Sequence, residues 1–165
     1  MPPPTLDDWE TFFAAQLGAV ATLGGLVFVG LSINLEKILA APALPNRALL
    51  ALGILLATLM ISSYVLIPGQ ELVSVGSEIL STAIGFAILS TAVDVYTLRR
   101  LPVHNKATFI GNALFLAVAV VPYMVGGVML IGGNIGGLYW VCAGVVLSII
   151  KAIADSWVLL VEINR

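Results

Sequence analysis

The sequence predicts an all-α transmembrane protein, a polytopic bundle of about five membrane-spanning helices. Of its 165 residues, 60% are hydrophobic and 10% are charged, and the mean hydropathy is +1.09. Soluble domains carry roughly 25% charged residues, so this composition excludes an ordinary soluble fold. The apolar residues fall into runs of about 20 or more, the length that crosses ~30 Å of hydrocarbon at 1.5 Å per residue. We expect residues 1–165 to form a single transmembrane domain.

The first helix is expected to begin after Thr5, because Asp8 follows three residues later and an acid in the first turn favours the helix dipole. The hydropathy pattern then predicts five spans, near residues 12–35, 47–67, 75–98, 108–131 and 137–161.

Four breaks separate these spans. Residues 40–47 hold two prolines, 68–71 open with Pro-Gly, 99–106 form the most polar stretch, and 132–137 are rich in glycine. Pro122 and the glycines of the fourth and fifth spans leave one alternative open, in which a re-entrant hairpin forms in this region and the chain has four spans.

The basic residues predict the orientation. Five spans with the N-terminus outside and the C-terminus in the cytoplasm put every flanking Lys and Arg on the cytoplasmic side, which is typical of a bacterial-type cytoplasmic membrane. These residues are Lys37, Arg47, Arg99, Arg100, Lys106 and Arg165.

The last span carries a polar stripe. At about 100° per residue, one face collects Gly137, Trp140, Gly144, Ser148, Lys151, Asp155, Val158 and Glu162. Lys151 and Asp155 are four residues apart and can meet. If Trp157 marks the inner interface, Lys151 lies about 9 Å inside, within reach of snorkelling. A structural ion pair or interface anchor is therefore one interpretation, and the lining of a water-filled path is the other.

The first and third spans carry small and polar residues on two faces each. Small residues at helical spacing let helices approach closely in lipid, so we expect neighbours on both sides of the first span. Burial in the chain's own bundle is preferred there over a pore lining. The predicted packing residues are Gly18, Thr22, Gly25, Ser32, Gly85 and Gly144. Asp94 lies about one turn from Arg99 and Arg100, so its simplest role is an interfacial salt bridge.

Under this orientation most polar and charged residues of the spans gather on the cytoplasmic side. The candidates for a pathway or polar cluster are Asn34, Glu36, Asp94, Ser148, Lys151, Asp155 and Glu162. Such a concentration fits a polar vestibule, a docking surface for a partner, or simple anchoring at the interface.

The sequence lacks the residues that several classes of function require. The single cysteine, Cys142, and the single histidine, His104, cannot build a Cys- or His-based metal site within one chain. No nucleotide-binding, hydrolase or metalloprotease motif occurs, and no basic face exists for nucleic acid. We therefore expect no catalytic residues, no metal and no cofactor, and we predict that the protein is not an enzyme.

Residues 9–39, WETFFAAQLGAVATLGGLVFVGLSINLEKIL, resemble the opening of a group of small bacterial membrane proteins. An aromatic start, a Gly/Ala-rich span and a closing L-S-I-N-L-x-x-I-L recur in that group. Some members are labelled modulators of a membrane-anchored AAA protease, so the resemblance implies a role in regulating a membrane-protein partner.

Two functions follow as hypotheses. The first is a homo-oligomeric channel or ion pathway, with Ser148, Lys151 and Asp155 from the last span and Asn34 and Glu36 from the first. The second is a non-catalytic accessory subunit that binds another membrane protein, such as a membrane protease, through its charged cytoplasmic rim.

Overall fold

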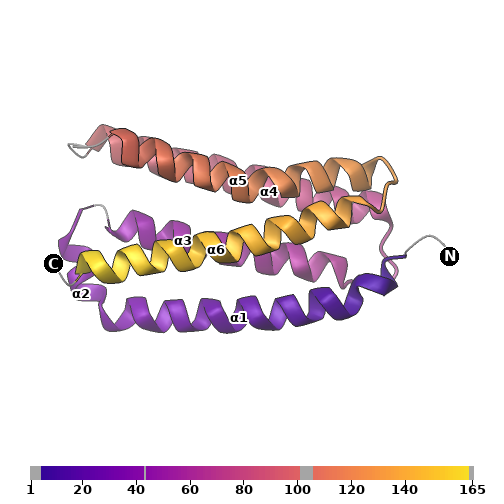
Figure 1. Cartoon of the computed structure of the whole chain (residues 1–165), viewed down its shortest axis with the longest axis horizontal. Helices are drawn as coiled ribbons and strands as arrows, with labels where there is room; N and C mark the ends of the chain where they lie inside the picture. Colours follow the sequence, from indigo (N-terminus) through magenta and orange to yellow (C-terminus); the bar gives the residue numbers. More distant parts are fainter. Residues whose placement is uncertain (1–4, 43, 101–105, 164–165) are drawn as a thin grey trace.

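The computed structural model describes residues 5–42, 44–100 and 106–163, and these residues are almost entirely helical (Figure 1). A 3-10 turn, η1 (Asp7–Trp9), leads into α1 (Glu10–Ile33). It is followed by α2 (Leu35–Ala40), α3 (Leu44–Val65), α4 (Leu72–Arg100), α5 (Lys106–Ile131) and α6 (Gly137–Ile163). The expected Thr5 cap is not formed: Leu6 is the N-cap residue of η1 and makes no side-chain capping bond, while the backbone N–H of Thr5 donates to Asp8 Oδ2 at 2.7 Å.

Five of the helices are long and apolar enough to cross a membrane, which confirms the predicted number. The candidate spans are Asp7–Ile33, Leu44–Val65, Leu72–Arg99, Ile110–Ile131 and Gly137–Glu162. The re-entrant alternative is wrong, because α5 and α6 are continuous over 26 and 27 residues and Pro122 lies within α5. The first span ends earlier than predicted, at Ile33, and the short α2 follows in place of a loop.

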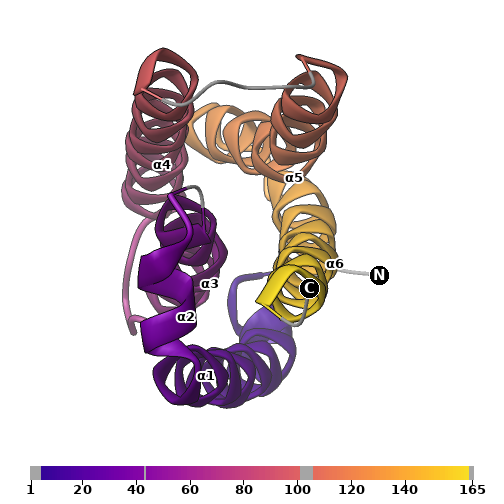
Figure 2. The same cartoon turned by 90° about the vertical axis from the view of Figure 1, so that its left-hand side faces the viewer.

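The helices form a bundle in which α3 is central. Helix α3 contacts α1, α4 and α6, and α5 packs between α4 and α6 (Figure 2). The N-terminus and the C-terminus lie at opposite ends of the bundle (Figure 1). We call the end that holds α2, the start of α3 and the last turn of α6 the α2 end.

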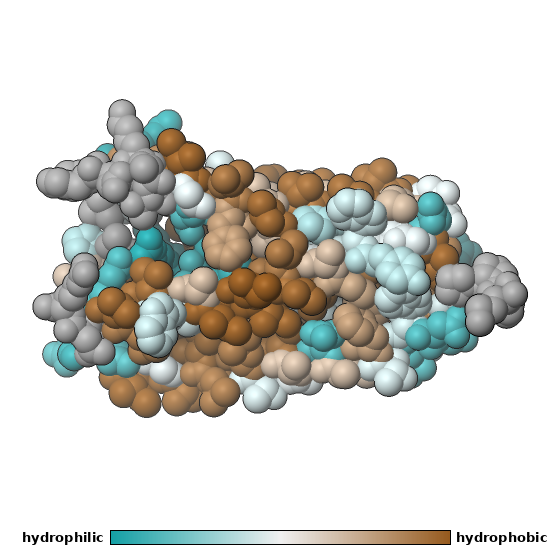
Figure 3. All heavy atoms as spheres, viewed as in Figure 1, coloured by the Kyte–Doolittle hydropathy of each residue, from teal (hydrophilic) through white to brown (hydrophobic). Residues whose placement is uncertain are grey.

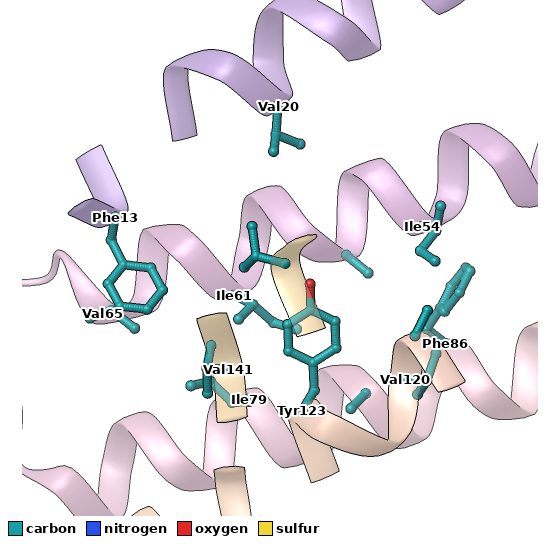
Figure 4. Packing of buried hydrophobic residues seen from close by; sticks show 14 of the residues in the cluster. Phe13, Val20, Ile54, Ile61, Val65, Ile79, Phe86, Val120, Tyr123 and Val141 are labelled. Carbon is teal, nitrogen blue, oxygen red and sulfur yellow. The ribbon is translucent and has the colours of Figure 1, made fainter. Parts of the chain in front are cut away.

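One large apolar core joins all five long helices, and a smaller apolar cluster lies at the α2 end. Figure 4 shows Phe13 of α1, Ile61 of α3, Ile79 of α4, Tyr123 of α5 and Val141 of α6 converging in the large core, and each is 2% exposed or less. On the visible surface, hydrophobic residues cover the middle and hydrophilic ones lie mostly toward the ends (Figure 3). A bundle whose interior and middle surface are both apolar fits a hydrocarbon environment.

Glycines bring α4, α5 and α6 into close contact away from the α2 end. A Cβ added at Gly127 would lie 3.0 Å from the carbonyl oxygen of Gly76, and one added at Gly126 would lie 2.7 Å from that of Gly137. No larger residue fits these crossings without moving a backbone. Gly144 also packs tightly, since its Cβ would meet the Tyr123 ring at 2.8 Å.

The other predicted packing residues touch no neighbouring helix within the chain. A Cβ at Gly18, Gly25 or Gly85 would meet nothing within 4 Å. The hydroxyls of Thr22 and Ser32 are exposed and donate to carbonyls of their own helix. The expected burial of the first span is also wrong: 11% of its apolar window is buried, against 56% for α3. Helix α1 lies at the edge of the bundle and packs mainly against α3, so its other face is left outward.

We predict that Gly126→Ala destabilises the protein by about 1–3 kcal/mol, because the added methyl group meets the Gly137 backbone and Val141. Gly111→Ala is the matched control in the same helix, where a Cβ meets nothing within 4 Å. Unfolding of the purified variants in detergent measures the difference. Equal stability of the two variants would contradict the glycine-dependent packing.

Candidate functional site

Lys151 of α6 is the most deeply buried charged residue in the described part of the chain, with 2% of its surface exposed. Its Nζ donates a hydrogen bond to Asn112 Oδ1 of α5 at 2.9 Å and forms an ion pair with Asp155, one helical turn further on. The ring of Phe115 lies beneath the ammonium, 5.5 Å from it. We call Asn112, Lys151 and Asp155 the polar cluster.

The polar cluster lies near the middle of α6. Lys151 is 14 residues from Gly137 and 12 from Ile163, or about 21 and 18 Å along the helix. Its side chain does not snorkel to an end of the bundle, because it is buried against α5 and paired there. The interface-anchor interpretation therefore does not describe Lys151, and a buried ion pair does.

Asp94 of α4 belongs to the same electrostatic environment. Its carboxylate interacts through space with Lys151, Asp155 and Arg47. The expected salt bridge to Arg99 is not formed; the side chain of Arg100 lies outside the described part of the chain. Asp94 also borders a cavity of about 390 Å³ between α4 and α5.

Buried hydroxyl groups continue from the polar cluster toward the apolar core. Ser148 is fully buried one turn before Lys151, with its hydroxyl near that of Tyr123. The hydroxyls of Thr58 and Tyr123 lie 3.2 Å apart. Beyond them the core is mostly apolar, with Ile61 and Val141 among its members (Figure 4), although Ser62 of α3 is also fully buried there. Polar groups are thus concentrated in one part of the interior.

Two further polar contacts lie toward the α2 end. Arg47 of α3 pairs with Glu162 of α6 at 3.0 Å, and Asn46 of α3 donates to Thr97 of α4 at 2.7 Å. Each contact joins α3 to a neighbouring helix close to the α2 end of the bundle. Glu162 is 42% exposed, so its pairing differs from the enclosed pair of Lys151.

The remaining two candidates do not join the polar cluster. The amide of Asn34 donates to the carbonyl of Gly30 in its own helix at 3.0 Å, and Glu36 is exposed on α2. Of the residues predicted from sequence, the structure therefore brings together Ser148, Lys151 and Asp155 along α6, with Asp94 nearby.

Sequence reasoning missed Asn112, whose amide oxygen accepts a hydrogen bond from Lys151 across the α5–α6 contact. A signal existed, because an amide within an otherwise apolar span is costly in lipid and calls for a partner. The sequence could not identify this partner, because the packing of the whole bundle decides which side of α5 contacts α6.

The site offers one ammonium, two carboxylates and an amide in an apolar surrounding, a set that can bind or relay a small ion or a proton. No group of three or more His, Cys, Asp or Glu side chains in residues 5–42, 44–100 and 106–163 is arranged to hold a metal ion. Comparison of the chain with protein families, curated proteins and solved structures gave no match.

We predict that Lys151→Met destabilises the protein by about 3–5 kcal/mol, because it leaves Asp155 buried without its counter-charge. The double variant Lys151→Met/Asp155→Leu should recover most of that loss. Unfolding in detergent measures both.

The control is Arg47→Met, which breaks a half-exposed pair and should cost less than about 1 kcal/mol. A Lys151→Met variant as stable as Arg47→Met would contradict the burial of the ion pair.

Proposed function

We propose that the protein is a multi-pass protein of a bacterial-type cytoplasmic membrane that provides an ion pathway. The α2 end would face the cytoplasm, which puts Lys37, Arg47 and Arg99 on that side, as expected for basic residues that flank spans. The observation that carries the proposal is the enclosed Lys151–Asp155 pair near the middle of α6.

The first reason for this proposal is the free energy needed to place two charged side chains inside a membrane span. A lysine or aspartate at the centre of a span costs about 2.5–3.5 kcal/mol on insertion scales, and apolar residues of similar size would hold the same helices together. Charged groups at this depth usually face a pathway or a partner rather than lipid. A stabilising role alone does not account for an ammonium and two carboxylates in one apolar interior.

The order of polar groups along the bundle is the second reason. From the α2 end inward come the Arg47–Glu162 pair, the polar cluster with Asp94, and the hydroxyls of Ser148 and Tyr123. This sequence of side chains provides a polar route over part of the span. The apolar core beyond it would act as a hydrophobic gate, which conducts when it becomes hydrated.

The pathway would run within each subunit, because the polar cluster lies between α5 and α6 of one chain. We also propose that the protein forms a homo-oligomer, and a separate observation supports this. The outward face of α1 presents small residues, Gly18, Thr22, Gly25 and Ser32, to the surroundings, and such faces favour close helix contacts in lipid.

We predict that the purified protein conducts ions in planar bilayers, and that charge changes in the cluster shift its selectivity in opposite directions. Lys151→Gln removes a positive charge and should increase the preference for cations, whereas Asp155→Asn should decrease it. The reversal potential in a salt gradient measures the shift.

Glu78→Gln is the control. Glu78 lies near the start of α4, at the end of the bundle opposite the α2 end, and accepts a hydrogen bond from Gln70. This variant should leave the reversal potential unchanged. Silent bilayers with confirmed insertion of the wild-type protein would remove the proposed function.

We predict a detergent complex whose protein mass is a multiple of 17.3 kDa, and a shift toward 17.3 kDa for Gly25→Leu. The leucine separates helices that meet through the small face of α1. Leu26→Ala, on a different exposed face of α1, should keep the wild-type mass. Light scattering gives both masses, and a wild-type monomer would contradict the oligomer.

A second candidate is an accessory subunit that regulates another membrane protein, as the resemblance of residues 9–39 implies. The exposed charges of α2, Glu36 and Lys37, favour it, because they are free to meet a partner at the membrane surface. Co-purification of one stoichiometric protein from native membrane, lost on Glu36→Lys/Lys37→Glu, would support this candidate over the pathway.

A further inference from the structure

The cavity between α4 and α5 has a size and a lining typical of a small-molecule site. Its volume of about 390 Å³ falls within the roughly 300–1,000 Å³ of ligand pockets. Its walls are mostly aliphatic, with Val95 and Leu98 of α4 facing Leu116 and Met124 of α5. Val95 and Val121, which also line it, are exposed on the sides of the bundle, so the cavity is accessible from the surrounding hydrocarbon.

Three polar side chains line this cavity, and two of them are already engaged. The hydroxyls of Ser90 and Thr91 both donate to the carbonyl of Ala87, at 3.0 and 2.7 Å. The third is Asp94, whose carboxylate accepts no hydrogen bond from the described residues. The polar group that remains for a ligand is therefore an acceptor.

The charges around the cavity favour a cation. The ammonium of Lys151 is in contact with Asp155, and Arg47 is in contact with Glu162. Asp94 interacts through space with Lys151, Asp155 and Arg47 but forms an ion pair with none of them, so these four groups and Glu162 together carry one net negative charge. In an apolar surrounding, a carboxylate gains most from a partner that brings a positive charge and a hydrogen-bond donor.

We propose that the α4–α5 cavity binds a lipophilic cation, with its apolar body between the two helices and its ammonium group on Asp94. The aliphatic walls would bury the body of the ligand, and the carboxylate would select for charge. A lipid acyl chain could fill the walls equally well, but it would leave the Asp94 carboxylate without a partner. This inference does not depend on ion conduction.

The test compares two probes of nearly equal shape, phenylbutylammonium and phenylbutanol, binding to the purified full-length protein in detergent. We expect the ammonium to bind about tenfold more tightly, a difference of about 1.4 kcal/mol, because it brings a positive charge as well as a donor to the Asp94 carboxylate. Asp94→Asn should remove that preference. Glu78→Gln, on the same helix but outside the cavity, should keep it.

A second variant tests the cavity itself. Ala117→Phe places a ring in the space that Ala117 lines and should weaken both probes. Because the comparison of the two probes on the wild-type protein stands alone, the test holds even if Asp94→Asn fails to fold. Equal affinity for both probes, no binding of either, or a preference that survives Asp94→Asn would each overturn the proposal. A cavity that retains a co-purified lipid against excess probe would do the same.

Discussion

The contact between Lys151 and its two partners is the constraint on which the arrangement of the bundle depends. A buried ammonium needs both a counter-charge and hydrogen-bond acceptors, and here Asp155 supplies the first and Asn112 supplies an acceptor from another helix. This requirement fixes the rotation of α6 and its register against α5. It also explains why a stripe of small and polar residues on α6 turns inward, while Ile150 and Ile153 on its other sides are exposed.

The contacts among α4, α5 and α6 differ between the two ends of the bundle. Away from the α2 end, Gly76, Gly126 and Gly127 allow backbones to touch, and dispersion forces between closely packed atoms hold α4, α5 and α6. Toward the α2 end these contacts give way to polar ones, with the cavity lined by Asp94 between α4 and α5. The tight part resists change and the polar part has room for water, an ion or a ligand.

The sequence predicted the fold class and the five long helices, because hydrophobic length alone decides which segments can span a membrane. It predicted less about how they face one another. Gly18 and Gly25 have the helical spacing of packing residues, yet a Cβ at either would meet nothing within 4 Å, whereas one at Gly126 or Gly127 would meet a neighbouring helix. Asn112 was missed for the same reason, since a contact between two helices depends on packing that no local pattern records.

The central claim is that the ammonium of Lys151 is enclosed and paired inside the bundle, and solid-state NMR in lipid bilayers tests it most directly. With nitrogen-labelled lysine side chains and carbon-labelled aspartate carboxyls, the pairing predicts a strong nitrogen–carbon correlation that disappears in Asp155→Asn. The nitrogen should also show little contact with lipid signals. A lysine nitrogen that correlates with lipid acyl chains, and with no aspartate carboxyl, would contradict the account.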